Sequence, residues 1–394
     1  MSPRSVAIVG AGIGGLTAAL ALSARDHEVA LIERRTGFGE TGAGIQLSPN
    51  ASRVLIGLGL GPALRRAAGE PERVVVRGLT SGRVIGEVAL GASMQQRFGA
   101  PYYVIHRAAL QTILLDAIRG RAGIRLLVGR KATAFAEAGD RAAVTIEATN
   151  GAVETLAADV IVGADGLWST TRAGMGDTRR PIHRRVVAWR ATIPLEAAPR
   201  ALHGNETGLW LGRAGHVVHY PIDNGRQLNV VVLEPRREPV EGWSAPGDGA
   251  ELVRGFRKAA PLLSALLEAP DAWLQWSLFD LPAKTMAKGR IALLGDAAHP
   301  VLPFLAQGGA LAIEDAAVLA ASLAEHRDLS AALGGYVSGR LRRVRRVQDA
   351  ARRNGTIFHA SGLVAFGRDL VMRRLGPDGM AERYAWLYGW TPPG

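Results

Sequence analysis

The 394-residue sequence predicts an α/β protein in which one α/β domain is interrupted by a strand-rich insertion and followed by a helical region. The chain opens with an apolar run, a glycine-rich turn, a helical stretch and a second apolar run closed by an acid, the order of a Rossmann-type βαβ unit. A buried strand, a loop and a helix return at residues 290–323, after a strand-rich segment. We therefore expect four parts, at residues 1–180, 181–276, 277–335 and 336–394.

The amino-acid composition is that of an ordinary globular protein and excludes sites that need cysteine. Hydrophobic residues at 48% and charged residues at 21% are ordinary globular values. The absence of cysteine excludes disulfides, thiolate zinc sites and iron–sulfur clusters, and it fits a cytoplasmic location. Of the 47 basic residues 43 are arginine, giving a net charge of +12 against 35 acidic residues.

The charge is not gathered into one binding footprint. Arginines are scattered from Arg4 to Arg374, without a cluster interleaved with aromatics, so we expect no nucleic-acid partner but an attraction for anionic small molecules. No apolar run reaches the ~18 to 20 residues of a membrane span, so we expect no membrane association.

The glycine turn follows the apolar run 6–9 and carries a specific spacing. Gly10 makes the tight turn, Gly12 lets the backbone approach a pyrophosphate, and Gly15 lets the following helix pack against the strand. Gly14 lies in the same turn. The helix N-terminus then faces the phosphates of a dinucleotide.

The second half of this unit supports the same interpretation. A helix at 16–24 leads to a strand at 29–32, and the strand is followed by Glu33. An acid at this position binds the ribose hydroxyls of a dinucleotide, and we expect the neighbouring Arg34 to contact the cofactor too. A signal peptide is the alternative for this N-terminus, and the second strand and the acid argue against it.

The rest of the first part mixes strands and helices, and the insertion is rich in strands. Helices are expected at 49–58 and 107–119, and strands at 74–76, 84–88, 102–105, 124–128, 143–148 and 159–162. The insertion carries expected strands at 186–193, 209–211, 216–220 and 228–233. A strand at 290–294 and a helix at 308–323 then return to the first domain.

A helix is expected over residues 337–351, with apolar residues on one face. We expect its arginines to lie mostly on a solvated outer face: Arg340, Arg342, Arg343, Arg346 and Arg353.

Three motifs stand in order along the chain: the glycine turn with Glu33, the segment Val160–Arg172 with Asp165, and the segment Gly295–Pro300 with Asp296. In this combination the sequence resembles the single-component FAD-dependent aromatic hydroxylases, the flavoprotein monooxygenases typified by para-hydroxybenzoate hydroxylase. It is most similar to the salicylate, 3-hydroxybenzoate and 6-hydroxynicotinate hydroxylase branch, through Gly44–Asn50, His106–Arg107, Pro303–Gly309 and Ile313–Asp315. The resemblance implies a discontinuous FAD-binding domain, an inserted β-sheet substrate domain and a C-terminal helical region.

The resemblance also implies which residues hold a non-covalent FAD. Asp296 would accept hydrogen bonds from the ribitol, Arg107 would meet the pyrophosphate with Gln111 one turn later, and Asp165 would lie between FAD and the nicotinamide route. The helix that starts near Gly308 would aim its N–H groups at the flavin. The implied cofactor residues are Gly10, Gly12, Gly14, Gly15, Glu33, Arg34, Gln46, Arg107, Gln111, Asp165, Asp296, Pro303, Gly308 and Gly309. A helix cap and a plain turn are the alternatives for Asp296 and Asp165.

Candidate catalytic residues come from the insertion. Side chains alternate along a strand, so His216 and Tyr220 share one face while His219 points away, which excludes a metal pair. By resemblance, His216 and Tyr220 would contact a phenolic substrate and relay its proton, and Gln307 would contact the substrate too. Core packing is the alternative for His216 and Tyr220.

The reaction that the resemblance implies is hydroxylation of a phenolic aromatic acid by O2 and NADH or NADPH, through a flavin C4a-hydroperoxide. Only one dinucleotide fold is visible, so the nicotinamide nucleotide would bind transiently. A homodimer is possible and no metal is expected. Other ring hydroxylases (of urate or quinone precursors), epoxidases, halogenases and a flavin-binding protein without turnover remain alternatives.

Overall fold

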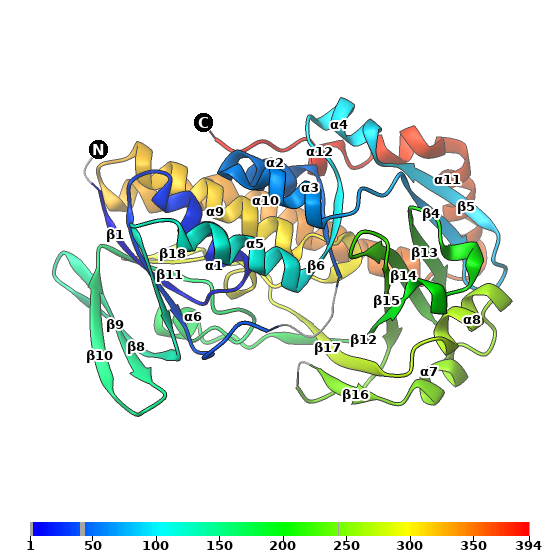
Figure 1. Cartoon of the computed structure of the whole chain (residues 1–394), viewed down its shortest axis with the longest axis horizontal. Coiled ribbons are helices and arrows are strands. Elements are labelled where there is room, and N and C mark those ends of the chain that lie inside the picture. Colours follow the sequence, from blue (N-terminus) through cyan, green and yellow to red (C-terminus); the bar gives the residue numbers. More distant parts are fainter. Residues whose placement is uncertain (1–2, 40–43, 243, 394) are drawn as a thin grey trace.

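Two large sheets organise the chain, which the computed structural model describes over residues 3–39, 44–242 and 244–393 (Figure 1). The first sheet has six strands in the order β18-β19-β11-β1-β2-β7, all parallel except β18. Its strands are β1 (Ser5–Val9), β2 (Glu28–Glu33), β7 (Ile124–Val128), β11 (Val160–Gly163), β18 (Ala287–Lys288) and β19 (Ile291–Leu293). The chain therefore returns to this sheet after the insertion, as the sequence predicts.

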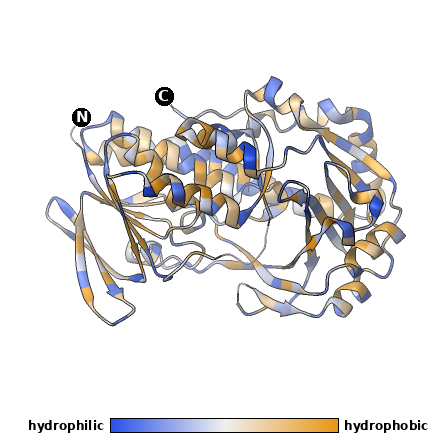
Figure 2. Cartoon of the chain, viewed as in Figure 1, coloured by the Kyte–Doolittle hydropathy of each residue, from blue (hydrophilic) through white to orange (hydrophobic). Residues whose placement is uncertain are grey.

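Helices pack against the first sheet and against one another. Helix α1 (Ile13–Ser23) contacts α5 (Arg107–Arg119) and α9 (Gly308–Glu325). Both α1 and α9 are buried along most of their length, and α9 shows long apolar stretches in Figure 2. Gly14 near the start of α1 lies against Ala312 near the start of α9, so the N-terminal ends of these two helices meet.

The second sheet has eight strands in the order β16-β17-β12-β15-β14-β13-β4-β5. Its strands are β4 (Arg73–Gly78), β5 (Val84–Ala89), β12 (Ile182–Pro194), β13 (Glu206–Gly212), β14 (Gly215–Ile222), β15 (Gln227–Pro235), β16 (Ala245–Gly247) and β17 (Trp273–Asp280). Both faces are apolar. One packs on α7 (Gly249–Gly255) and α8 (Pro261–Glu268), and the other faces the C-terminal helices and η5 (Pro303–Leu305).

Strands β4 and β5 show where the sequence-based division and the structure differ. We predicted that residues 1–180 form part of the first domain, yet β4 hydrogen-bonds to β13 of the insertion in parallel register. The strands themselves lie where they were expected. Strand β13, the partner of β4, lies more than 100 residues away in the sequence, so no local pattern reports this pairing.

Smaller elements complete the chain. They are β3 (Gly44–Leu47) paired with β6 (Tyr103–His106), a three-stranded sheet of β8 (Arg130–Ala138), β9 (Arg141–Ala148) and β10 (Val153–Ala158), and helices α2 (Pro49–Leu55), η1 (Ile56–Leu60), α3 (Gly61–Ala67), α4 (Ala92–Phe98) and α6 (Thr170–Gly174). The short turns are η2 (Leu195–Ala197), η3 (Arg200–Leu202) and η4 (Gly295–Ala297).

The last part is helical, with α10 (Leu329–Phe358), α11 (Gly362–Glu382) and α12 (Ala385–Tyr388). On α10 the arginines Arg342, Arg346 and Arg353 are exposed, as predicted. The prediction was wrong for Arg340, whose side chain is completely buried, and for Arg343, whose side chain is only 12% exposed.

An ion network inside the helix pair explains why Arg340 is buried. Helix α9 carries Glu314 and Asp315 on its buried surface, and Arg340 donates to Glu314 Oε2 at 2.6 Å and to Asp315 Oδ1 at 2.7 Å. Arg343 adds a second bond to Glu314 Oε2 at 2.7 Å, and His299 Nε2 lies 2.5 Å from Asp315 Oδ2. Two buried carboxylates need cations, so α10 turns arginine toward the core.

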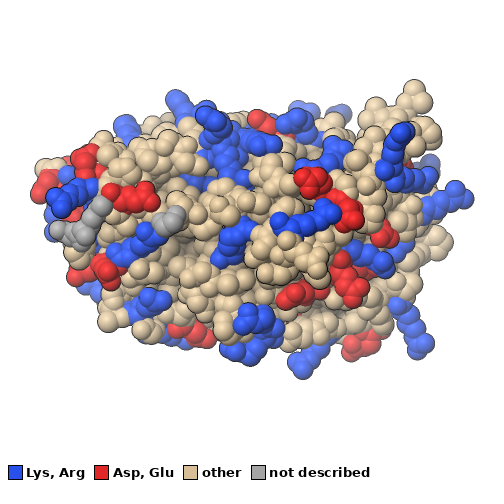
Figure 3. All heavy atoms as spheres, turned by 90° about the horizontal axis from the view of Figure 1, so that it is seen from above, with Lys and Arg blue, Asp and Glu red and all other residues tan. Residues whose placement is uncertain are grey.

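The described part of the chain holds no helix that is long and apolar enough to cross a membrane. On the face drawn in Figure 3, basic and acidic side chains are interspersed and do not form one basic footprint.

Candidate active site

The glycine turn is shaped by close backbone packing. Gly10 has φ +104° and donates to Ile32 O at 2.8 Å, and a Cβ at Gly15 would lie only 1.9 Å from Gly10 O. A Cβ at Gly14 would lie 3.0 Å from Cβ of Ala312 on α9. Gly12 differs from the others: a Cβ built there meets nothing within 4 Å. The space beside Gly12 is therefore open, as a bound pyrophosphate requires.

Two alanine substitutions separate these roles. Gly12→Ala is expected to keep the fold, because Gly12 has φ −74° and open space, but to weaken FAD binding at least tenfold by blocking close approach. Gly15→Ala is the matched contrast, and it should lower the yield of folded protein. Thermal unfolding with and without added FAD measures both effects. Tight FAD binding by the Gly12→Ala protein would contradict the assignment.

Glu33 and Gln111 converge on this turn from different elements. Glu33 Oε2 accepts from the Ala11 N–H at 2.9 Å, and Gln111 Nε2 on α5 lies 3.5 Å from Ala11 O. The exposed Arg34 follows β2 directly. The structure thus brings Glu33 and Gln111 to the glycine turn and leaves Arg34 at the surface beside it.

Asp296 lies at the carboxyl end of β19 in an unusual setting. Every residue from Ile291 to Pro300 is buried except Asp296, whose side chain is exposed. Burial by the surrounding protein nevertheless raises its pKa, while the charges of His299 and Arg107 lower it. A carboxylate that is open to solvent but surrounded by buried neighbours accounts for both observations and is placed to meet a ligand.

Asp296→Ala is expected to reduce the free energy of FAD binding by about 1 to 3 kcal/mol, because a buried hydroxyl of the cofactor would lose its hydrogen-bond acceptor. Titration of the apoprotein with FAD, followed by flavin fluorescence, measures the change. Asp223→Ala, at an exposed turn of the second sheet, is the control. An unchanged dissociation constant for Asp296→Ala would remove this residue from the site.

Asp165 is part of a helix cap. Its carboxylate accepts from Ser169 Oγ at 2.6 Å and from the Thr171 N–H at 3.0 Å, at the start of α6. The buried Arg172, whose role the sequence reasoning missed, donates to Leu167 O and Ala297 O at 2.9 Å. Arg172 therefore ties the Asp165 loop to the Asp296 loop.

The segment from Pro303 to Gly309 ends at the N-terminus of α9. In the part of the chain that the structure describes, no side chain caps this helix, so the N–H groups of Gly308 and Gly309 remain available. Pro303 is exposed. Gln307 is buried, donates to Ser48 Oγ at 2.9 Å and accepts from Asn50 Nδ2 at 3.1 Å, so its amide is held in a polar network.

These features fit FAD. The open Gly12, the exposed Asp296 and the uncapped start of α9 gather at one edge of the first sheet, with Arg107 close enough to Asp296 to act on its pKa. Glu33 and Gln111 complete the end near the glycine turn.

The two candidate catalytic residues lie on the inner face of the second sheet. His216 and Tyr220 on β14 are both buried, whereas His219 packs against Trp210 on the opposite face, as predicted. The His216 ring lies 5.3 Å from that of Phe304 on η5. A Cβ at Gly44 would lie 2.5 Å from the Tyr220 ring.

Their protonation follows from burial. Burial lowers the pKa of His216 well below its usual value, and the charge of His359 lowers it further. Burial and the neighbouring Tyr102 raise the pKa of Tyr220 far above its usual value, against a hydrogen bond to Gln46 that lowers it. Gln46 also accepts a hydrogen bond from Tyr102. At neutral pH the pair is thus a neutral imidazole and a neutral phenol.

Two residues on this side were missed by the sequence reasoning. His359, at the end of α10, makes a 2.9 Å hydrogen bond to His216 Nδ1. Asn229 lies opposite Tyr220 in the sheet, and its Oδ1 accepts from the Gly44 N–H at 2.8 Å while its buried Nδ2 has no partner among the described residues. Neither residue belongs to a local motif, so no sequence signal marks them.

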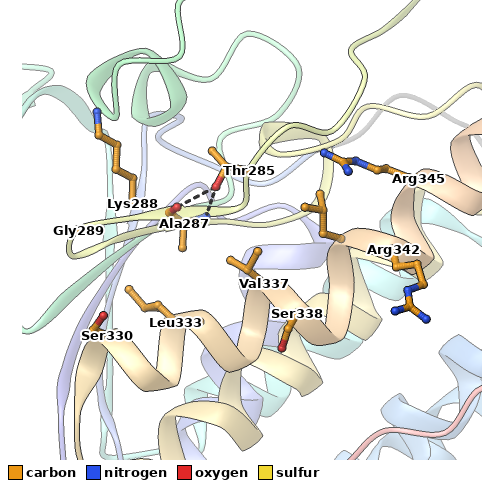
Figure 4. Close-up of a pocket in the computed structure, with 12 residues that line it drawn as sticks. Thr285, Ala287, Lys288, Gly289, Ser330, Leu333, Val337, Ser338, Arg342 and Arg345 are labelled. Atoms are coloured by element: carbon orange, nitrogen blue, oxygen red, sulfur yellow. Dashed lines mark hydrogen bonds between the residues drawn. The ribbon is translucent and has the colours of Figure 1, made fainter.

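A groove of about 740 Å³ lies elsewhere, between α10 and the end of β18 (Figure 4). Leu333 and Val337 line it together with Lys288, Arg342 and Arg345, and its lining includes none of the predicted site residues.

Comparison with known proteins decides the family. The family model described as "FAD binding domain" matches residues 4–351. The chain belongs to this family. FAD is its cofactor, and it is a flavoprotein monooxygenase of the aromatic hydroxylase type with a para-hydroxybenzoate hydroxylase-like fold.

Relatives of this FAD-binding chain cover nearly its whole length. It is 34% identical to 3-hydroxybenzoate 6-hydroxylase of Polaromonas naphthalenivorans (strain CJ2) over 98% of this chain and 96% of that protein. It is 38% identical to a 3-amino-4-hydroxybenzoate 2-monooxygenase of Streptomyces platensis, with the same coverage. The structure of Klebsiella pneumoniae HpxO complexed with FAD and uric acid matches with a TM-score of 0.84 and 27% identity, over 96% of this chain and 95% of that one.

Proposed function

We propose that this enzyme hydroxylates the ring of a phenolic aromatic acid, of the hydroxybenzoate, salicylate or hydroxynicotinate class, with O2 and NAD(P)H. The two relatives above are named as a hydroxylase and a monooxygenase of hydroxybenzoates, which supports this substrate class. The HpxO complex holds uric acid, so urate is the second candidate.

One observation carries the proposal. The inner face of the second sheet is apolar, and it presents His216 beside Phe304 and Tyr220 beside Gly44. Phe304 and Gly44 belong to Pro303–Gly309 and Gly44–Asn50, two segments through which the sequence resembles the family and which carry predicted cofactor residues. A ring held on this face would lie between the proposed proton-handling residues and the flavin.

His216, Tyr220 and their apolar neighbours would have different roles in the reaction. The neutral His216 can accept the phenolic proton, and the protonated Tyr220 can donate a hydrogen bond to the same oxygen or to a ring substituent. Apolar neighbours such as Val218 and Leu211 exclude water from the ring. When bound, FAD supplies the redox chemistry that takes hydride from NAD(P)H and activates O2.

Gln307 remains a proposed substrate contact. Its amide is bonded to Ser48 and Asn50 in the structure, so a substrate would have to exchange for one of these hydrogen bonds. Asp165 remains proposed near the nicotinamide route, and NADH or NADPH is the proposed reductant.

A substrate panel tests the function. Hydroxybenzoates, salicylate, 6-hydroxynicotinate and urate are added to the holoenzyme with NADH or NADPH, and reductant oxidation and product mass are followed. A phenolic acid is expected to stimulate oxidation and to gain one oxygen atom. Stimulation by urate alone would favour the second candidate, and oxidation that no aromatic compound stimulates would refute hydroxylation.

We further propose a homodimer formed through α11. Six large apolar side chains of this helix are exposed, among them Leu363 at 89% and Phe366 at 69%, while Met372 on its inner side packs at Gly86 of the edge strand β5. Contiguous exposed apolar residues mark interaction surfaces. Light scattering is expected to give a dimer for the wild type and a monomer for Phe366→Glu. A wild type that is monomeric both at high concentration and after 50-fold dilution would contradict the proposed dimer.

A further inference from the structure

The contact between His216 and His359 joins the buried inner face of the second sheet to the protein surface. His216 is buried, with 2% of its surface exposed, whereas His359 is partly exposed at the end of α10. The two imidazoles are linked from Nδ1 of His216 to Nε2 of His359 at 2.9 Å. His359 is the one hydrogen-bond partner of His216 among the residues that the structure describes.

The surroundings leave few other routes for a proton. The rings of Phe304 and Phe358 flank His216 at 5.3 and 5.4 Å and offer no acceptor. Two charged groups lie at the end of α10: Arg368 donates to Ile357 O and Phe358 O, and Asp369 pairs with Arg368 at 2.7 Å. These two charges balance each other, so the environment does not hold His359 permanently protonated.

We propose that His359 is the positioning and exit residue that passes protons between His216 and solvent, so that the phenolic proton of the substrate leaves the site along this pair. This inference rests on the proposed function of the site. His216 Nδ1–H donates to His359 Nε2, which leaves His216 Nε2 free to accept.

One proton leaves the substrate and one proton reaches water. The substrate O–H bond breaks and its proton binds His216 Nε2, while the Nδ1 proton of His216 moves to His359 Nε2. His359 then releases its Nδ1 proton to water, and both rings are neutral again as the opposite tautomers. The reverse passage, when the ring oxygen of the product is reprotonated, restores the first tautomers, and no oxidant or reductant is consumed.

Burial fits this role, because it lowers the pKa of both imidazoles. Neither ring then stores the proton, and each only transmits it. A second imidazole is required because His216 has almost no contact with solvent.

The test uses the holoenzyme and 3-hydroxy-4-nitrobenzoate, a phenolic acid whose absorption changes when the phenol ionises. Mixing in a stopped-flow instrument measures the rate at which the bound phenolate appears. His359→Gln keeps a hydrogen-bonding side chain at this place but cannot carry a proton. We expect ionisation at least tenfold slower than in the wild type, with recovery on addition of free imidazole and little change in the dissociation constant of the probe.

The control is His326→Gln, because His326 also stands at a helix end, after α9, with Nδ1 3.1 Å from Ser322 O. Its ionisation rate should equal that of the wild type. An unchanged rate in His359→Gln, with ionisation still lost in His216→Ala, would overturn the exit role and leave the proposed function standing. A wild type that neither binds the probe nor oxidises NADH faster with any phenolic acid would refute the proposed function itself.

A second measurement needs no variant and decides the matter if His359→Gln fails to fold. The ionisation rate of the wild type is measured in mixtures of H2O and D2O. Two protons moving together through both imidazoles predict a curved dependence on deuterium content, and a linear dependence would overturn the proposal.

Discussion

Replacing Tyr220 by phenylalanine or His216 by alanine is expected to lower product formation by about 10²- to 10⁴-fold, the usual range for acid–base groups, while FAD stays bound. Both side chains lie on the inner face of the second sheet, so the proposed cofactor contacts of the first sheet at Gly12, Glu33 and Asp296 remain. Reduction by NADH should fall less than hydroxylation. The variants should therefore release hydrogen peroxide in place of product, which a peroxide assay and product chromatography measure together.

Stability separates catalysis from core packing at these two positions. Both residues are buried, so a purely structural role would appear as lost folding or lost FAD. His219→Ala is the matched control, since His219 is equally buried on the same strand but faces Trp210 on the other side. Normal turnover per bound flavin in Tyr220→Phe, combined with a lower melting temperature, would show that the residue is structural.

Arg340→Met is expected to destabilise the fold by about 3 to 5 kcal/mol, the cost of leaving buried charges without their partner. Arg340 is completely buried and bonds both Glu314 and Asp315. Although burial alone would raise the pKa of Asp315, the neighbouring charges of His299 and Arg340 and its hydrogen bonds lower it to about 2. The contribution of this lowered pKa is therefore present above 3.8 and is lost as the pH falls toward 2.

Chemical denaturation at pH 7 measures the effect of Arg340→Met. Arg342→Met on the same helix is the control, because Arg342 is exposed and an exposed substitution changes stability by only about 0.5 kcal/mol. Asn50 donates to both Glu314 and Gln307, so it links the Arg340 network to the start of α9. The Arg340→Met variant should therefore also bind FAD more weakly. Equal stability of the two variants would mean that the network adds nothing to folding.

Local features of the sequence were sufficient for much of the first domain. The spacing of Gly10, Gly12 and Gly15 before a helix predicts a turn whose backbone is too close for side chains at Gly10 and Gly15 but open at Gly12, and the structure has this form. Alternation along β14 predicts that His216 and Tyr220 share a face, and they do. Such predictions succeed because the information lies within one strand or one turn.

Pairings across the chain were decided only by the tertiary structure. The sheet that β4 and β5 join, the burial of Arg340 against α9 and the contact of His359 with His216 all depend on partners between 25 and 143 residues away. An arginine next to apolar helix positions has the same local pattern whether water or a buried carboxylate meets it. The sequence by itself therefore determined the cofactor fold and one face of the proposed site. The packing of distant elements determined which polar groups are buried together. Burial could not be predicted locally, because it is a property of the whole folded chain and not of a local pattern.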